Sequence, residues 1–298
     1  MELTPYSILP SSPIGGNKMI IAERKTALVT GANSGIGLEL TKKLIENGWA
    51  VAALIRSEFP KEEQMLQQKI RAGEIRVYHA DIADFRQLKS ALKLIKEKET
   101  KLDALFNNAG GSFSKLVFSP QGRELHYEIQ TVVPFIITME LLDLLKKGKP
   151  AIVIQTSSDA FKFKKSFVPE ELANPPKFQK LIGPYASTKL AITLWTHAFA
   201  QELKREGVTI ISIDPGNNNT MRKGRNGGLP LIIQPFIHLF GPHPSVGAGR
   251  LFAGLEKSPH EAGLYFRKGK PVEFKFKQHA AQVLLQVQYV YEKEYLSL

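Results

Sequence analysis

Short apolar runs alternate with longer segments of helical periodicity along most of the chain. The apolar runs, which are typical of buried β-strands, cover residues 25–30, 49–57, 75–84, 102–111, 151–160, 208–216 and 263–269. Helical spacing of apolar residues is found at 38–48, 61–73, 85–99, 124–148 and in the segment that follows Tyr185. Strands that alternate with helices predict parallel βαβ units. We therefore expect an α/β fold in one domain, with a doubly wound parallel sheet of about seven strands.

Two segments that interrupt this pattern, 1–18 and 217–262, suggest how the chain is organised. Residues 1–18 contain Pro5, Pro10 and Pro13 and no regular period, so we expect a poorly structured N-terminal extension rather than a signal peptide. Residues 19–298 are expected to form the domain. The variable segment around 217–262 includes the apolar stretch 227–240, which we interpret as a substrate lid or, alternatively, as a pair of core helices. No apolar run reaches the roughly 18–20 residues of a membrane helix.

A glycine-rich turn, "TGANSGIG" at 30–37, falls between the first predicted strand and the first helix. Gly31, Gly35 and Gly37 would let the backbone turn tightly and approach a pyrophosphate, which the N–H groups of the helix N-terminus can bind. A glycine pattern alone is weak evidence. Its position at a strand-to-helix turn is what the mechanism of dinucleotide binding requires, so it predicts a Rossmann-type nucleotide site.

The stretch "GPYASTKLA" at 183–191 places Tyr185 and Lys189 four residues apart, on one face of a predicted helix. An ammonium group beside a phenol favours the phenolate and would lower the tyrosine pKa from about 10. A phenol tuned in this way can act as a general acid or base. Taken alone, the pair could equally be two residues on a solvated helix face.

Five motifs in one order resolve this ambiguity. The chain carries T-G-x-x-x-G-I-G at 30–37, "NNAG" at 107–110, Ser158, Y-x-x-x-K at 185–189 and "PG" at 215–216. In this order they resemble the short-chain dehydrogenase/reductase family over about residues 24–270. The segment "RELHYEIQTVVPFIIT" and the tail after Ser245 look most like the retinol dehydrogenase-like branch.

The resemblance implies specific roles for individual residues. Tyr185 matches the catalytic acid/base, Lys189 the residue that lowers its pKa and holds the ribose hydroxyls, and Ser158 the residue that hydrogen-bonds the substrate oxygen; Ser157 is the weaker candidate for that role. Besides Tyr185 and Lys189, cofactor contacts are implied for Gly31, Asn33, Ser34, Gly35, Ile36, Gly37, Arg56, Asp81, Ile82, Asn108, Ala109, Gly110, Pro215, Gly216, Asn218 and Thr220.

The residues after the second strand indicate which nicotinamide cofactor is preferred. Ile55 stands where an acidic residue would bind the ribose of NAD, and Arg56, which follows it, suits the 2′-phosphate of NADP. NADP(H) is therefore favoured over NAD(H), although Glu58 and Glu62 lie nearby in the sequence.

One position departs from the family pattern. Gln130 stands where the family carries the asparagine of its catalytic tetrad, which holds a water that connects the lysine to solvent. Glutamine has the same donor and acceptor groups on a longer side chain. We therefore include Gln130 as a catalytic candidate that either serves this relay from a shifted position or alters it.

Composition and charge restrict the remaining function classes. The chain has no cysteine, which excludes disulfides and thiolate chemistry and fits a cytoplasmic location, and its seven histidines form no metal-binding pattern. The net charge of +12 comes without a nucleic-acid-binding motif, so we expect no nucleic acid partner. The predicted function is NADP(H)-dependent hydride transfer between the nicotinamide and an apolar carbonyl or alcohol substrate. The alternatives are a non-catalytic NADP sensor and a double-bond reductase; weak association with a membrane surface and a homo-oligomer are further expectations.

Overall fold

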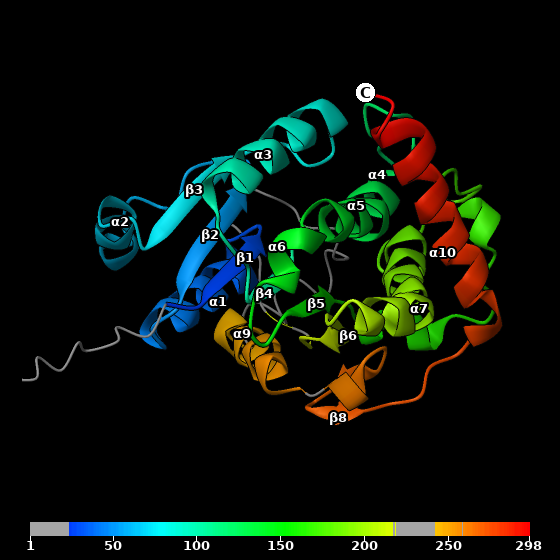
Figure 1. Cartoon of the computed structure of the whole chain (residues 1–298). Helices are drawn as coiled ribbons and strands as arrows, with labels where there is room; N and C mark the ends of the chain where they lie inside the picture. The colour runs from blue at the N-terminus through cyan, green and yellow to red at the C-terminus, as the bar shows by residue number, and fades with distance from the viewer. Residues whose placement is uncertain (1–23, 217, 219–241, 258) are drawn as a thin grey trace, which may run out of the picture.

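The computed structural model describes residues 24–216, 218, 242–257 and 259–298. Within this part, an eight-stranded sheet has the strand order β3-β2-β1-β4-β5-β6-β7-β8 (Figure 1). All neighbouring strands are parallel except β7 and β8. The strands are β1 (Thr26–Thr30), β2 (Ala50–Ile55), β3 (Ile75–His79), β4 (Ala104–Asn107), β5 (Ile152–Thr156), β6 (Thr209–Asp214), β7 (Tyr265–Arg267) and β8 (Lys270–Pro271).

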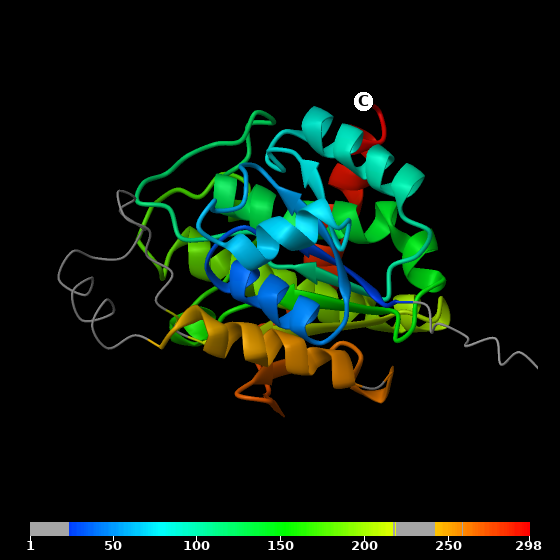
Figure 2. The same cartoon turned by 90° about the vertical axis from the view of Figure 1, so that its left-hand side faces the viewer.

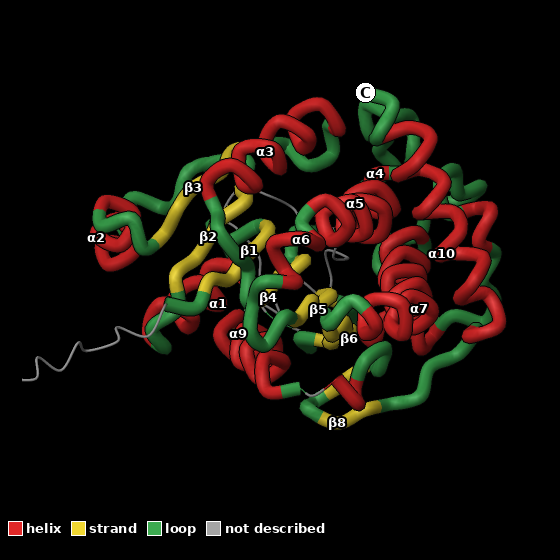
Figure 3. The backbone as a smooth tube through the Cα atoms, in the orientation of Figure 1, coloured by secondary structure: helices red, strands yellow, loops and turns green. Residues whose placement is uncertain are grey.

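The helices connect these strands and cover both faces of the sheet, which confirms the doubly wound α/β prediction (Figure 3). They are α1 (Gly35–Glu46), α2 (Gln64–Arg71), α3 (Phe85–Lys98), α4 (Leu125–Tyr127), α5 (Val133–Glu140), α6 (Leu142–Lys146), α7 (Pro184–Arg205), α9 (Pro244–Phe252) and α10 (Ala280–Tyr289). All seven predicted strands are present, and β8 is an additional strand of two residues. Helices α9 and α10 were not predicted from the sequence.

The sheet separates two hydrophobic cores, because successive side chains of a strand point to opposite faces. Ala27 and Val29 of β1 pack with α1, α2 and α9, whereas Leu28 between them packs with α3, α5, α7 and α10. The first side of the sheet is visible in Figure 2, where α9 runs beside α1.

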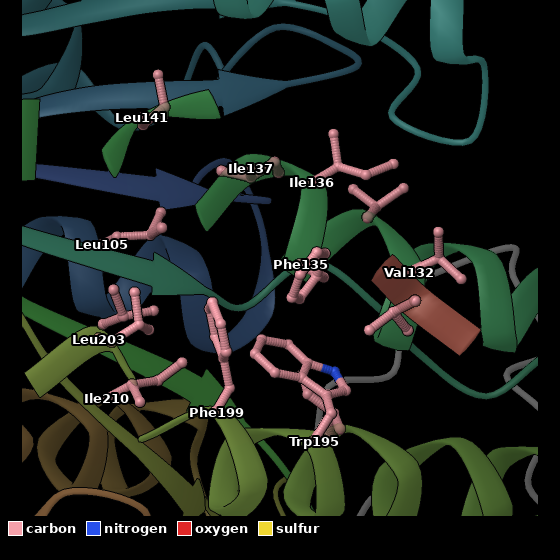
Figure 4. Close-up of a cluster of buried hydrophobic side chains, with 14 of the residues drawn as sticks. Leu105, Val132, Phe135, Ile136, Ile137, Leu141, Trp195, Phe199, Leu203 and Ile210 are labelled. Carbon is pink, nitrogen blue, oxygen red and sulfur yellow. The ribbon is translucent and has the colours of Figure 1, made fainter. Parts of the chain in front are cut away.

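The second core is centred on the contact between α5 and α7. Phe135 of α5 meets Trp195 of α7 edge to face at 5.5 Å between ring centroids and Phe199 at 5.4 Å (Figure 4). Rings packed in this way bury large apolar surfaces and hold the helices in a fixed relation. Helix α7, which carries Tyr185 and Lys189 in its first two turns, is thereby anchored along most of its length.

The segment 124–148 is not the continuous helix that its periodicity predicts. A π-helical turn, Glu128–Val132, separates α4 from α5, and Leu141 separates α5 from α6. A π turn shifts the directions of the side chains beyond it, and such turns are frequent at functional sites. Gln130 lies within this turn.

The predicted lid is only partly described. Residues 244–252 form α9, which packs against α1 as part of the first core. Residues 219–241, with Thr220 and the apolar stretch 227–240, lie outside the described residues, as does the segment 1–18. The lid and the N-terminal extension therefore stay predictions.

Candidate functional site

The candidate site lies where the strand order reverses, at the carboxyl ends of β1 and β4. Open α/β sheets bind ligands at such a switch point, because the loops after the two strands run in opposite directions and leave a crevice. The glycine-rich turn follows β1, and "NNAG" follows β4. Ser158 follows β5, and Pro215 follows β6, so four of the predicted motifs lie along one edge of the sheet.

The glycine-rich turn is built around Gly31, Gly35 and Gly37. Gly31 and Gly35 have φ values of 67° and 54°, in the left-handed region that glycine adopts without strain. A Cβ atom on Gly37 would lie 2.1 Å from the carbonyl oxygen of Gly31, so no other residue fits there. Ser34, in extended conformation, is the N-cap of α1 and Ile36 lies in its first turn. The backbone thus brings the N-terminus of α1 to the crevice, as an anion site requires.

The loop after β4 is fastened to the end of β1. The backbone N–H groups of Asn108 and Ala109 donate to Thr30 Oγ1 at 2.9 and 2.8 Å, and Asn108 Nδ2 donates to the Thr30 carbonyl at 3.0 Å. Asn108 therefore holds the two loops together. A Cβ on Gly110 would meet the side chain of Gln130 at 2.9 Å, which explains the small residue at that position.

Arg56 and Asp81, both predicted cofactor contacts, face each other across the ends of β2 and β3. Arg56 Nη1 lies 3.3 Å from Asp81 Oδ2, and both side chains are exposed. Such a pair contributes little to stability, so the guanidinium can take another anionic partner at low cost. Glu58 is the acidic residue close to Arg56 in the sequence that spoke against NADP, and its Oε1 lies 3.2 Å from His79 Nε2.

Two other predicted cofactor residues have structural partners. The side-chain amide of Asn33 donates to the carbonyl of Ser57 and so connects the glycine turn to the end of β2. Ile82 packs against the second core. Both residues therefore shape the crevice from its edge.

Three of the predicted catalytic residues lie near one another in the fold: Ser158 follows the carboxyl end of β5, and Tyr185 and Lys189 lie in the first two turns of α7. The hydroxyl of Tyr185 lies close enough to the Ser158 side chain for Ser158 to lower the Tyr185 pKa, and Ser158 Oγ accepts from the Ala160 N–H at 3.2 Å. Ser157, the weaker candidate, points the other way: its hydroxyl donates to the Lys189 carbonyl and contacts Thr193 Oγ1 at 2.7 Å. The structure thus brings Ser158, and not Ser157, to Tyr185.

Lys189, one helical turn after Tyr185 in α7, is buried, with 5% of its surface exposed. Its ammonium donates to the Thr156 carbonyl at 2.6 Å. Burial lowers the Lys189 pKa from 10.5 to about 7, and the nearby Asp214 carboxylate opposes this effect only in part.

The pKa of Tyr185 differs from the sequence prediction. Burial is the largest influence and raises it; the hydrogen bond from Ser158 lowers it, and the charges of Asp214 and Asp159 raise it further. The prediction that Lys189 lowers the Tyr185 pKa is therefore wrong for the protein without a bound cofactor. The physical reason is that desolvation disfavours the phenolate, while the ammonium of Lys189 is directed to the Thr156 carbonyl.

Asp214 is the buried charged residue of the site that the motifs did not identify. It is 4% exposed, and burial raises its pKa. Its carboxylate accepts from the Gly216 N–H at 2.9 Å and thus fixes the "PG" loop. It directly follows Ile213, which pairs with Thr156, the residue that binds Lys189. An acidic residue at the end of a buried strand, directly before "PG", was the signal that could have revealed it.

The "PG" loop is held from the other side by α9. Arg250 Nη1 donates to the Pro215 carbonyl at 2.9 Å, and Gly216 has a φ of 82°. The side-chain amide of Asn218 donates to the Gly216 carbonyl at 2.7 Å and accepts from the Gly247 N–H at 3.0 Å. Asn218 therefore connects the loop to α9, which is a structural role not anticipated from the sequence.

Gln130 points toward the loop after β4. It is 1% exposed, and its Nε2 donates to the Gly111 carbonyl at 2.8 Å. Its Oε1 has no hydrogen-bond partner among the described residues. The neighbouring Thr131 donates to the Thr188 carbonyl, one residue before Lys189. Gln130 is thus placed beside the loop after β4, with one buried acceptor that has no partner in the described part of the protein.

A separate cavity of about 440 Å³ lies at the opposite edge of the sheet, near the amino ends of β1 and β3. Its principal charges pair with one another: Arg76 with Glu99 at 2.6 Å, and Arg24 with Glu74 at 2.6 Å. It is remote from the predicted catalytic residues. We interpret it as a solvated gap between charged surface residues.

Among the residues that the structure describes, no helix combines the length and the apolar character that crossing a membrane demands. Nor does any group of three or more His, Asp or Glu side chains there have the arrangement of a metal site.

Comparison with known proteins identifies the family. Residues 25–170 match the family model described as short chain dehydrogenase. Retinol dehydrogenase 14 of Mus musculus is 29% identical over 237 residues, which cover 76% of this chain and 70% of the relative. Retinol dehydrogenase 13 of Mus musculus is 29% identical over 256 residues, with 81% and 75% covered.

Solved structures agree in fold. Carbonyl reductase Sniffer of D. melanogaster superimposes with a TM-score of 0.60 at 21% identity, covering 84% of this chain and all of that one. An oxidoreductase from Brucella ovis, solved in complex with a partially ordered NAD, gives 0.54 at 21% identity, with 82% and 99% covered. The motifs, the strand order and these matches together show that the chain belongs to the short-chain dehydrogenase/reductase family of oxidoreductases, and within it the chain is similar to retinol dehydrogenases.

Proposed function

We propose that this protein is an NADP(H)-dependent oxidoreductase that interconverts an apolar carbonyl compound and its alcohol. The observation that carries the proposal is the proximity of Tyr185 to Ser158, with the buried Lys189 one helical turn after Tyr185 in α7. These three groups lie along the same sheet edge as the glycine-rich turn. A proton donor and a nucleotide-binding turn beside one another are what carbonyl reduction by a nicotinamide requires.

The residues present fit a dinucleotide. The positive φ angles of Gly31 and Gly35 and the N-terminus of α1 form a backbone anion site for the pyrophosphate. Ile55 is buried and apolar, whereas Arg56 is exposed and only loosely paired with Asp81. This arrangement supports NADP, because a guanidinium can bind a 2′-phosphate through two N–H groups.

The chain's own residues would manage the proton and the developing charge. When bound, the nicotinamide supplies a hydride to the carbonyl carbon or, in the reverse direction, accepts one. Tyr185 donates its phenolic proton to the carbonyl oxygen, so that C=O becomes C–OH and the tyrosine becomes phenolate. Ser158 donates a hydrogen bond to the same oxygen and stabilises its negative charge in the transition state. A charged Lys189 stabilises the phenolate until a proton returns to it.

The substrate class is inferred from the relatives. Both relatives described above are named for retinol, an apolar alcohol. We therefore expect apolar alcohols and aldehydes of similar character to be accepted here. The alternatives, an NADP sensor and a double-bond reductase, leave the Ser158–Tyr185 pair without a function that uses both hydroxyls. A cytoplasmic location and association with a membrane surface are separate proposals, which fractionation of the cells that make the protein would test.

The proposal is tested by turnover of the purified protein. NADPH and NADH are each offered with a panel of apolar aldehydes and ketones, and we expect oxidation of NADPH to be faster. Tyr185→Phe should retain the fold and NADPH binding but reduce turnover at least ~10²-fold, the lower range for a positioned acid. Tyr289→Phe, at an exposed tyrosine of α10, is the matched control. NADPH binding without turnover of any panel member would instead favour a sensor.

A further inference from the structure

A buried acid–histidine pair, Glu124 and His126, lies beside the candidate site and is not explained by the catalytic residues. The two side chains are 0% and 1% exposed, and Glu124 Oε1 lies 2.6 Å from His126 Nδ1. The His126 ring meets the Tyr185 ring edge to face, with 6.0 Å between their centroids. Buried charged groups are retained where they have a definite partner, so this pair calls for an explanation.

The hydrogen bonds assign the proton on the imidazole. His126 Nε2 accepts from the backbone N–H of Phe113 at 2.9 Å, so this nitrogen carries no proton. Nδ1 then carries it and donates to Glu124. Both ring nitrogens are engaged, and His126 therefore has no free atom with which to exchange protons with a substrate. Any effect of His126 on the reaction therefore comes from the neighbouring residues that it holds in place.

The same bonds use both carboxyl oxygens of Glu124 as acceptors. Its second oxygen, Oε2, accepts from the Tyr127 N–H at 3.0 Å at the start of α4. Two donors thus point at one side chain, and a carboxylate can accept from both. An amide offers one oxygen only, so a glutamine could satisfy just one of them.

The pair connects three segments that meet around the His126 ring. Phe113 belongs to the loop after β4, and its ring packs on His126 at 4.6 Å. Phe178 belongs to the segment before α7 and stacks on His126 at 6.5 Å. The backbone N–H of Glu124 donates to the Ala173 carbonyl at 2.8 Å, which ties the same segment to α4. Phe113 and Phe178 are half-buried, so each ring keeps part of its surface accessible.

We propose that Glu124 and His126 are positioning residues that hold Phe113 and Phe178 around the His126 ring, which meets Tyr185, and so form an aromatic wall next to the catalytic tyrosine. The wall would bind the planar, unsaturated part of a substrate next to its carbonyl group. The inference rests on the proposed function and narrows its substrate class to conjugated or aromatic carbonyl compounds. A merely structural cap of α4 would need Glu124 alone and would not require a ring in contact with Phe113, Phe178 and Tyr185.

The test compares two aldehydes in the full-length enzyme with NADPH. His126→Phe keeps an aromatic ring but removes both hydrogen bonds, and Glu124→Gln removes one acceptor. We expect the KM for cinnamaldehyde to rise at least tenfold in His126→Phe and by a smaller factor in Glu124→Gln. The kcat/KM for propanal and the Kd for NADPH should change less than threefold. His197→Phe, at a half-buried histidine of α7 beside Phe274, is the matched control and should change neither aldehyde.

Hydrogen exchange provides a readout that does not depend on activity. In His126→Phe the Phe113 amide should lose its protection, and exchange across residues 111–118 should become faster, while the core strands stay protected. Equal losses for both aldehydes, or unchanged exchange at Phe113, would overturn the inference. A wild-type protein that reduces no aldehyde at all would refute the proposed function instead, so the two failures are distinguishable.

Discussion

Burial of Lys189 should make the protein less stable at neutral pH than it would be with an apolar residue at this position. Burial lowers the pKa of Lys189 from 10.5 to about 7. At 1.36 kcal/mol per pH unit, this change corresponds to a cost on the order of 5 kcal/mol for keeping the ammonium charged in the folded state. The hydrogen bond to the Thr156 carbonyl is part of that environment. Its loss in a variant should cost roughly 1–2 kcal/mol.

The sign of the pH dependence follows from proton binding. Between pH 7 and 10.5 the unfolded chain keeps the proton that folded Lys189 has lost, so the free energy of unfolding rises with pH in this window. Below about pH 7 both states are protonated and the full cost is present. Lys189→Met lacks the titrating group. It should be about 3 kcal/mol more stable than the wild type at pH 6, and this advantage should vanish by pH 10.

Urea unfolding at pH 6, 8 and 10 measures the difference directly. Lys146→Met is the control, because Lys146 is an exposed lysine paired with Glu206 and its pKa is raised rather than lowered. Lys189→Met should at the same time lose carbonyl turnover, so that its gain in stability is accompanied by a loss of function. A Lys189→Met variant less stable than the wild type at pH 6, or a difference that does not change with pH, would refute the reasoning.

Three further changes test other parts of the site. Arg56→Ala should weaken NADPH binding by roughly 1.5–3 kcal/mol and leave NADH binding nearly unchanged, as measured by calorimetry; equal losses would exclude Arg56 as the discriminator. If Gln130 serves the relay, Gln130→Leu should slow turnover and alter the pH–rate profile. Gln130→Asn should keep a turnover rate within about tenfold of the wild type. A Gln130→Leu pH–rate profile that overlays that of the wild type would show that Gln130 is not part of the site. Asp214→Asn removes a charge that raises the Lys189 pKa, so the pH dependence of stability should move to lower pH; a curve that does not move would show that this charge has no effect.

Much of the fold could be predicted because its pattern is local. Buried parallel strands read as continuous apolar runs, and each of the seven predicted runs contains a strand. Helix α10 was missed for the opposite reason. Its apolar residues, such as Val283 and Val287, become meaningful only when they cover α7, which lies nearly one hundred residues earlier in the chain. Periodicity indicates that a face is apolar but not what covers it.

The residues of the site differ in the same way: some could be predicted from the local sequence, and others depend on contacts between distant segments. Gly31 and Gly37 were predictable, because a tight turn at a strand end restricts the residue type locally. The pKa of Tyr185 was not predictable, because it depends on burial and on the charges of Asp159 and Asp214 from other strand ends. Glu124 and His126 were not singled out either. Their two-residue spacing becomes a hydrogen bond only because α4 begins between them.

Gln130 shows why a matched position does not predict a matched direction. The comparison of residue types assumes a regular helix, in which positions three and four apart lie on one face. The π turn Glu128–Val132 contains an i→i+5 connection, which rotates the residues that follow it relative to those before it. Within this turn, Thr131 reaches the helix of Lys189, and its neighbour Gln130 reaches the loop of Gly110 and Gly111. If a relay passes through Gln130, it must therefore enter the site from the β4 loop, through the free Oε1 acceptor, and not along the face of α7.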